Sequence, residues 1–176
     1  MTTTDNTLQL ASAPSVLLLF GLAGSGKSYI GDLMSRLTGW HVYHADEDIT
    51  EEMRLALAEH RPFTDEMRDR YFSIVVDRIR QLQQKYNHLL VTQAVYKQRH
   101  RDYLVSQIPQ MELIHVQADE HVIETRLQER AGEASAKSAA ALRKDFESPT
   151  MDYKVLKNNN GDMAIVRQLN AFYADA

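Results

Sequence analysis

Short apolar runs alternate along the chain with longer segments in which apolar residues recur every three or four positions. Short runs of this kind are typical of buried strands, whereas the longer spacing is typical of amphipathic helices. We expect strands at residues 15–20, 41–44, 88–92, 111–116 and 153–156. Because strands and helices alternate, we expect an α/β fold, a three-layer sandwich in which helices cover both faces of a parallel sheet.

Helical spacing is clearest in two segments. In KSYIGDLMSRLT, one face is formed by Ile30, Leu33, Met34 and Leu37. In DEMRDRYFSIVVDRIRQLQQ, one face is formed by Met67, Tyr71, Ile74, Val75, Ile79 and Leu82. We expect both faces to pack against the sheet. A final helix is expected from about residue 163, after the turn KNNNGD.

The domain organisation follows from length and local composition. The 176 residues are enough for one sizeable core and too few for two ordinary domains. We therefore expect a single domain over residues 15–176, preceded by a flexible tail at residues 1–14. Residues 131–141, AGEASAKSAAA, are small or polar and can bury little apolar surface, so we expect a small mobile lid there.

Composition narrows the class of protein. Hydrophobic residues make up 44% and charged residues 25%, which is typical of an ordinary globular protein. Lys and Arg number 20 against 24 Asp and Glu, so we expect no nucleic-acid partner. There is no cysteine, which excludes disulfides and thiolate metal sites and fits a cytoplasmic location. We expect no targeting segment, because the first residues have neither a positively charged region nor a long apolar region. We expect no membrane span, because no apolar run approaches roughly 18 residues.

The stretch GLAGSGKS follows the first expected strand and precedes the first helix. Its glycines allow backbone conformations closed to other residues, so successive N–H groups can surround phosphate oxygens at the positive end of the helix. The pattern GxxxxGK[ST] in this context predicts a nucleoside triphosphate site, with Lys27 at the β- and γ-phosphates and Ser28 as a magnesium ligand. The expected nucleotide-binding residues are Gly21, Leu22, Ala23, Gly24, Ser25, Gly26, Lys27 and Ser28.

Three consecutive carboxylates, Asp46, Glu47 and Asp48, follow the second expected strand. The carboxyl ends of parallel strands line the ligand crevice, so a carboxylate here can face the γ-phosphate and accept the proton of a substrate hydroxyl. Glu47 and Asp48 can equally cap the helix that follows. The third strand ends in Thr92 and Gln93, where a nucleotide hydrolase of the switch type would carry a carboxylate, which argues against hydrolysis as the activity.

Four stretches occur in an order and spacing that resemble the gluconate kinase family, a branch near the shikimate kinases among the P-loop small-molecule kinases. They are GLAGSGKS, VYHADEDI, RPFTDEMRDRYF, and TQAVYKQRHRDYL leading on to LIHVQADEHVIETRLQERAG. Together they cover most of residues 15–157. The resemblance implies a five-stranded sheet of order 2-3-1-4-5, the use of ATP and Mg2+, and phosphoryl transfer to a hydroxyl of a small anionic metabolite such as gluconate. It also implies a homodimer.

The same resemblance implies roles for individual residues. Asp46 falls on the second aspartate of the family's Asp-Gly-Asp run, which implies that it grips or deprotonates the acceptor hydroxyl, whereas His44 replaces the first aspartate. Arg68 falls on the arginine of the family's TDEDR motif and is implied to face an anionic substrate. After a one-residue insertion, two basic residues match the third-strand motif of the family, Lys97 and Arg101. Each either binds the substrate carboxylate or is a surface residue of a helix without a role in binding.

Arg126 and Arg130 lie four residues apart, hence on one face of a helix directly before the expected lid. The resemblance implies that one of them flanks the adenine or the ATP phosphates, for which we choose Arg126, and that the other closes over the transferring phosphoryl group, for which we choose Arg130. The alternative is a ladder of ion pairs with Glu124, Glu129 and Glu133.

The sequence departs most from the family in the stretch that is implied to bind the acceptor. Family members carry an Asn-Ile-x-Lys-Met stretch, and the corresponding residues here, about 53–57, read MRLAL. A site built to hydrogen-bond hydroxyls rejects molecules that lack them, so this change bears on the substrate. Two alternatives to a gluconate-like acceptor therefore stay open: a shikimate-like or nucleoside or nucleotide kinase, and a non-catalytic ATP-binding regulatory module. The loop at residues 158–161 is implied to cup adenine.

Overall fold

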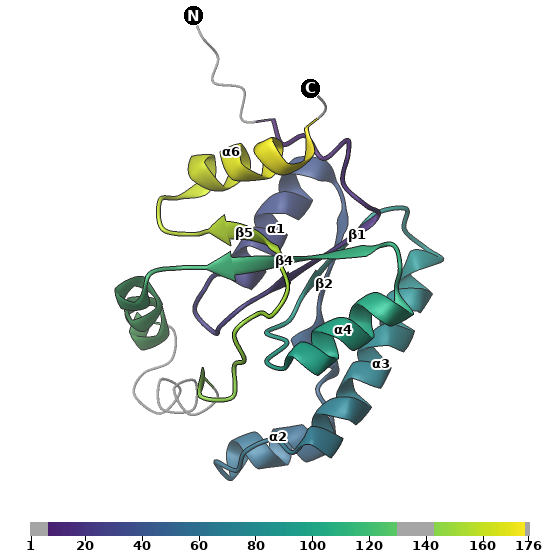
Figure 1. Cartoon of the computed structure of the whole chain (residues 1–176), viewed down its shortest axis with the longest axis vertical. Helices are drawn as coiled ribbons and strands as arrows, with labels where there is room; N and C mark the ends of the chain where they lie inside the picture. The colour runs from purple at the N-terminus through teal and green to yellow at the C-terminus, as the bar shows by residue number, and fades with distance from the viewer. Residues whose placement is uncertain (1–6, 130–142, 175–176) are drawn as a thin grey trace, which may run out of the picture.

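The computed structural model describes residues 7–129 and 143–174 (Figure 1). Its centre is a five-stranded sheet in the order β2-β3-β1-β4-β5, and the paired strands are parallel. The order predicted from the resemblance is therefore confirmed. The strands are β1 (Val16–Phe20), β2 (His41–His44), β3 (Leu89–Thr92), β4 (Met111–Gln117) and β5 (Lys154–Lys157).

The central strand β1 is buried along its whole length. Successive side chains of a strand point to opposite faces of the sheet. Leu18 and Phe20 accordingly join one hydrophobic cluster, whereas Leu17 and Leu19 join the other. The continuous apolar run VLLLF thus reflects a strand covered on both faces, as expected for a parallel sheet.

Helices cover both faces of the sheet (Figure 1). The helices α1 (Lys27–Thr38) and α6 (Asp162–Tyr173) supply residues to one cluster, and α3 (Asp65–Gln83) and α4 (Gln98–Gln107) to the other. The expected inner faces of α1 and α3 are confirmed except at their borders, where Leu37 is 40% and Ile74 is 42% exposed. The buried stripe of each helix is therefore narrower than the apolar pattern suggests.

A short 3-10 helix, η1 (Ala45–Asp48), follows β2 directly, and α2 (Glu51–Ala58) comes next. Thr50 caps α2, because its side chain accepts a hydrogen bond from the backbone N–H of Met53 at 3.1 Å. Met53 and Ala56 bury their side chains in the same cluster as α3. These elements hold the start of η1 at the carboxyl edge of the sheet.

The beginning of the chain is more ordered than we expected. Leu8 and Leu10 are buried, and the backbone N–H of Ser12 donates to the carbonyl oxygen of Tyr173 at 2.9 Å. The backbone N–H of Gln9 also donates to Asn170 Oδ1 at 2.7 Å. The expectation of a flexible tail over residues 1–14 is thus wrong from residue 7 onward, because two alternating leucines anchor the segment beside α6.

Two further expectations concern the rest of the chain. The expected lid at residues 131–141 lies outside the described residues. Within the part of the chain that the structure describes, no helix is both long and apolar enough to cross a membrane.

Candidate active site

The phosphate-binding turn joins β1 to α1 and requires glycine at two points. Gly26 has φ of 96°, and a Cβ there would lie 2.1 Å from Asn158 Nδ2. Gly21 has φ of 153°, and a Cβ there would lie 2.4 Å from the carbonyl oxygen of Val116. Any side chain at either position would displace its neighbour. The turn therefore packs directly against the carboxyl ends of β4 and β5.

Two side chains hold the carbonyl groups of this turn from outside. Arg126 Nη1 donates to the carbonyl oxygens of Gly24 and Ser25, both at 3.2 Å, and Asn158 Nδ2 donates to the Ser25 oxygen at 2.9 Å. In a trans peptide the N–H points away from the carbonyl oxygen, so the N–H of Gly26 points away from these two side chains. This N–H group belongs to the N-cap of α1, at the positive end of the helix dipole, and no side chain caps the helix there. This arrangement fits an anion such as a phosphate.

A cavity of about 340 Å³ opens from this turn. Its lining includes the phosphate-turn residues Gly24 and Gly26 together with Lys27, Ser28 and Asp46 of η1. Lys27 Nζ also donates to the carbonyl oxygen of Leu22 at 3.0 Å. The structure thus brings the predicted lysine, hydroxyl and carboxylate together around one space.

Asp46 is held by a hydrogen-bond network that the sequence did not reveal. Gln93 Nε2 donates to Asp46 Oδ1 at 2.9 Å and also to the hydroxyl oxygen of Tyr71, which in turn donates to the carbonyl oxygen of Ala45 at 2.6 Å. The backbone N–H of Ala94 donates to Gln93 Oε1 at 2.6 Å. Burial, with the nearby Asp46 charge, raises the pKa of Tyr71 far above its ordinary value, so its hydroxyl stays a donor.

Arg68 lines the same cavity and is only 4% exposed. Its guanidinium carbon lies 5.8 Å from the ring centre of Phe63 and 5.4 Å from that of Tyr96. Nη2 donates to Asp145 Oδ2 at 3.0 Å, whereas the buried Nε has no hydrogen-bond partner among the described residues. A buried donor without a partner destabilises the folded chain, so this position is suited to an acceptor brought by a ligand.

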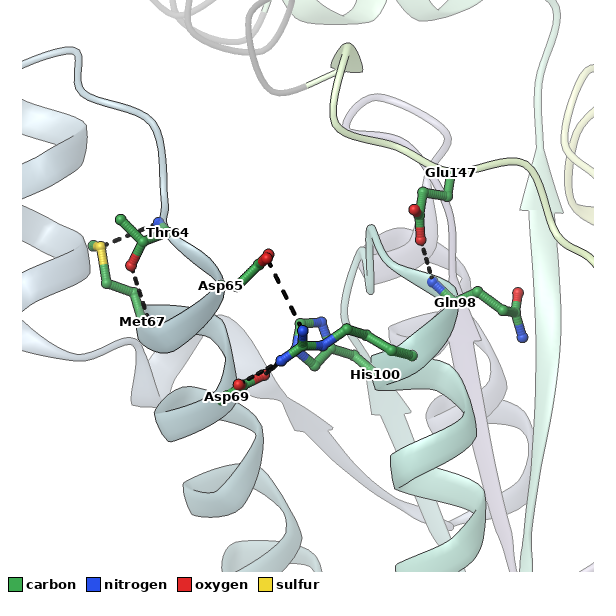
Figure 2. Close-up of polar contacts among 8 residues, drawn as sticks. Thr64, Asp65, Met67, Asp69, Gln98, His100 and Glu147 are labelled. Carbon is green, nitrogen blue, oxygen red and sulfur yellow. Dashed lines mark hydrogen bonds and ion pairs between the residues drawn. The ribbon is translucent and has the colours of Figure 1, made fainter.

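The first turns of α3 and α4, which carry Arg68 and Arg101, are fastened together (Figure 2). His100 Nε2 and Asp69 Oδ1 lie 2.7 Å apart, and Glu147 Oε1 accepts from the backbone N–H of Gln98 at 2.8 Å. The hydrogen bond from His100 lowers the pKa of the Asp69 carboxyl. The contact between His100 and Asp69 fixes the part of α3 that carries Arg68, and the hydrogen bond from Gln98 holds Glu147 beside the start of α4.

His44, which replaces the first aspartate implied by the resemblance, does not line the cavity. Its Nδ1 lies 2.7 Å from Thr92 Oγ1, and its Nε2 lies 2.8 Å from Asp32 Oδ1. Thr92 does line the cavity. The histidine therefore connects a cavity hydroxyl to an exposed carboxylate on α1, and the sequence held no signal for Asp32 as its partner.

A second cavity, of about 480 Å³, lies on the other side of the phosphate turn. Gly26 lines both cavities, so they meet at this residue. Arg126 lines the second cavity, as do Asn158 and Gly161 from the loop that we expected beside adenine. Arg126 Nη2 donates to the carbonyl oxygen of Asn158 at 2.9 Å, which ties this loop to the turn.

Of the predicted substrate-binding residues, Lys97 and Arg101 are absent from the lining of both cavities, and of the turn residues Gly21, Leu22 and Ser25 are absent from it as well. Arg101 has no exposed surface, and its guanidinium donates to the carbonyl oxygens of Val95, Tyr96 and Glu147 at 2.8 to 3.1 Å. Its predicted contact with a substrate carboxylate is therefore contradicted, because backbone acceptors already take its donors. Lys97 is the N-cap of α4 and is not part of the lining. Arg130 lies outside the described residues.

A phosphate-binding turn between β1 and α1, in a parallel sheet of order 2-3-1-4-5, defines a fold of the P-loop kinase type. A family model described as an AAA domain (AAA_18) matches residues 17–151. The chain belongs to this family.

Individual proteins give a narrower likeness. A probable gluconokinase of Mus musculus is 45% identical over 56 residues, which are 32% of this chain and 30% of that protein. The gluconokinase of Gluconobacter oxydans (strain 621H) is 22% identical over 129 residues, 73% of this chain and 72% of that protein. The match to the mouse relative thus spans less than a third of its length.

Among solved structures, a gluconokinase from Sinorhizobium meliloti 1021 has a TM-score of 0.73 and 21% sequence identity, with 90% of each chain covered. At this identity the match shows the shared fold. Together with the two sequence relatives, it confirms the resemblance to the gluconate kinase family that the four motifs predict.

Proposed function

We propose that this protein is an ATP-dependent kinase that transfers the γ-phosphoryl group to a hydroxyl of a small anionic metabolite. The observation that carries the proposal is the position of Gly26 between two cavities. One cavity holds a carboxylate and a buried guanidinium, Asp46 and Arg68, and the other is lined by Arg126 and the loop before α6. A triphosphate bound along the turn would have its base in the second cavity and its terminal phosphate in the first.

Each residue of the first cavity has a role in this proposal. Asp46 orients the acceptor hydroxyl and accepts its proton, and the hydrogen bond from Gln93 holds one carboxylate oxygen in place. Lys27 contacts the β- and γ-phosphates, where its charge stabilises the transition state. Arg68 binds the negative charge of the acceptor. Arg130 remains our candidate for the residue that closes over the transferring group, and the expected lid at residues 131–141 would exclude water.

The residues present also fit magnesium. Ser28 offers a hydroxyl at the start of α1, as the P-loop pattern requires, and magnesium bound there with the phosphates would neutralise their charge. Within the described ranges, no three His, Asp or Glu side chains are grouped so that they could hold a metal ion. We therefore infer that magnesium binds with the nucleotide rather than in a cage of protein carboxylates.

The relatives indicate the kind of acceptor. The proteins from Gluconobacter and Sinorhizobium are named gluconokinases and the mouse protein is named a probable gluconokinase. Gluconate or a similar sugar acid is therefore the first acceptor to test. The protein has a predicted cytoplasmic location and a predicted homodimeric state. We keep both as part of the proposal.

The direct test measures ADP release and the phosphorylated product with Mg-ATP and a panel of sugar acids, polyols, cyclitols and nucleosides. A kinase gives one acceptor that raises ADP release far above hydrolysis and yields an equal amount of phosphorylated product. ATP binding with no acceptor-dependent turnover across the panel would instead favour the regulatory-module alternative.

A further inference from the structure

The wall of the first cavity away from the phosphate turn is formed largely by hydrocarbon. Met53 and Phe72 are each only 4% exposed, and Leu57 is 36% exposed. The apolar residues in this lining are Ile49, Met53, Leu57, Phe63 and Phe72. They come from α2, the segments beside it and α3, and several belong to the main hydrophobic cluster. A ligand beyond the phosphate turn therefore meets carbon over much of its surface.

Two polar groups of this lining, Gln93 and Tyr71, already bind one another. Both hydrogen bonds from Gln93 Nε2 go to Asp46 and Tyr71, and Gln93 Oε1 accepts from a backbone N–H. The Tyr71 hydroxyl donates to a backbone carbonyl and accepts from Gln93. Neither side chain has a hydrogen available for a ligand hydroxyl without breaking this network.

Lys27, Ser28 and Asp46 of this lining are assigned to the phosphates, magnesium and the acceptor hydroxyl in the proposed function, and Thr92 contacts His44. Arg68 and Tyr96 are the two polar side chains considered for the rest of the ligand. Arg68 Nε is buried and has no hydrogen-bond partner among the described residues, and the Tyr96 hydroxyl has none there either. Both line the cavity, and the Arg68 guanidinium lies over the Tyr96 ring at 5.4 Å. A guanidinium N–H beside a phenol is suited to one carboxylate group. This part of the cavity can therefore bind an anion, but it offers few donors and acceptors to the hydroxyl groups of a ligand.

We propose that the preferred acceptor is a hydroxy acid with one carboxylate and few further hydroxyls, whose hydrocarbon body packs on Met53, Leu57 and Phe72. This inference rests on the proposed kinase activity and narrows its substrate class. The acceptor oxygen forms a bond to the γ-phosphorus while the bond to the bridging oxygen breaks, ADP leaves with that electron pair, and Asp46 takes the hydroxyl proton. Each additional hydroxyl held against this wall without a partner should weaken binding about tenfold.

The test compares acids of equal chain length with a carboxylate at one end and a hydroxyl at the other. Gluconate, a deoxygluconate and ω-hydroxyhexanoate form such a series with falling hydroxyl content. Two measurements are made on the full chain: kcat/KM for phosphorylation with Mg-ATP, and the Kd of each acid by calorimetry with a non-hydrolysable ATP analogue. We expect the acid poorest in hydroxyls to exceed gluconate at least about tenfold in both.

Substitution of Met53 tests the wall itself. Met53→Asn adds a donor and an acceptor to it and should move the ratio of kcat/KM toward gluconate by about tenfold. Leu55→Asn is the matched control, because Leu55 lies on the same helix, is 48% exposed and is not part of the lining. That variant should keep the parental ratio. Thermal unfolding of both variants shows whether either fold is disturbed.

The outcomes separate this inference from the kinase proposal. Phosphorylation of gluconate with kcat/KM equal to or above that of the hydroxyl-poor acid overturns the inference and leaves the kinase in place. A nucleoside as the best acceptor also overturns it. Tight binding of the hydroxyl-poor acid without any product refutes the kinase, and with it the role of this acid as an acceptor. Absence of binding by every acid in the series overturns the inference.

Discussion

Replacement of the buried Arg101 by Met tests whether this arginine supports the active-site wall or contacts substrate. Its guanidinium is packed between two rings, with its carbon 4.8 Å from the centres of both Phe20 and Phe146. Its Nε donates to the carbonyl oxygen of Val95 at 2.9 Å. Val95 has φ of 46°, which is strained for a β-branched residue. Methionine keeps much of the apolar stem and removes every donor.

The expected loss follows from the acceptors left behind. Three backbone carbonyls lose a charged donor, and one such contact contributes about 1.5 kcal/mol or more. The contacts with the two rings add about 1 kcal/mol. Relief of the desolvation of the guanidinium offsets part of this, so we expect the free energy of unfolding to fall by about 4 kcal/mol. The turn that carries Gln93 and Tyr96 should loosen with it.

Urea unfolding of the parent and Arg101→Met measures this loss. Arg99→Met is the control on the same helix, because Arg99 is 54% exposed and solvent screens its ion pair with Asp69. A stability change below about 1 kcal/mol in Arg101→Met, together with a tenfold higher KM for the acceptor, would refute the structural role. That result would instead support the predicted contact between Arg101 and the substrate carboxylate.

Two further predictions concern residues near the phosphate turn. Burial and the nearby Arg101 charge lower the pKa of His115 from 6.5 to about 4, so the unfolded chain binds more protons between these values and stability falls as the pH drops through them. Between pH 7 and pH 5 we expect the free energy of unfolding, measured in urea, to fall by about 2 kcal/mol more in the parent than in His115→Asn. Parallel pH profiles of the two proteins would contradict this. Arg126→Met removes the donor that the carbonyls of Gly24 and Ser25 share, although Ser25 still accepts from Asn158. Calorimetry should therefore show about tenfold weaker ATP binding, and an unchanged Kd would exclude this role.

Much of the fold could be predicted from the sequence because its signals are local. Alternation of short apolar runs with amphipathic helices specifies a covered parallel sheet, and the strands lie within a residue or two of their expected positions. The strand order came from the resemblance, since periodicity carries no information on which strands are neighbours. The ordered start of the chain was missed because two leucines in a polar segment give a weak pattern, and only their packing beside α6 shows their role.

The candidate site also contains residues that the sequence predicts and residues that it does not. Gly26, Lys27 and Asp46 were predictable because strand ends and the glycine pattern place them at one edge of the sheet. Arg101 was misjudged, because sequence gives the charge of a side chain and not the backbone carbonyls that surround it. The Gln93–Tyr71 network was missed because Tyr71 reads as one more apolar position of α3, and its partners come from segments distant in sequence.

The central claim is that Asp46 activates an alcohol beside a phosphate held by the turn. Steady-state turnover of Asp46→Asn, with the best acceptor of the panel, tests it most directly. Asp48→Asn is the control, because Asp48 lies in the same 3-10 helix and accepts from Tyr43 outside the cavity lining. The account predicts a fall in kcat of at least about a hundredfold for Asp46→Asn, with the Kd for ATP unchanged and Asp48→Asn near the parent. Parental turnover in Asp46→Asn would contradict it.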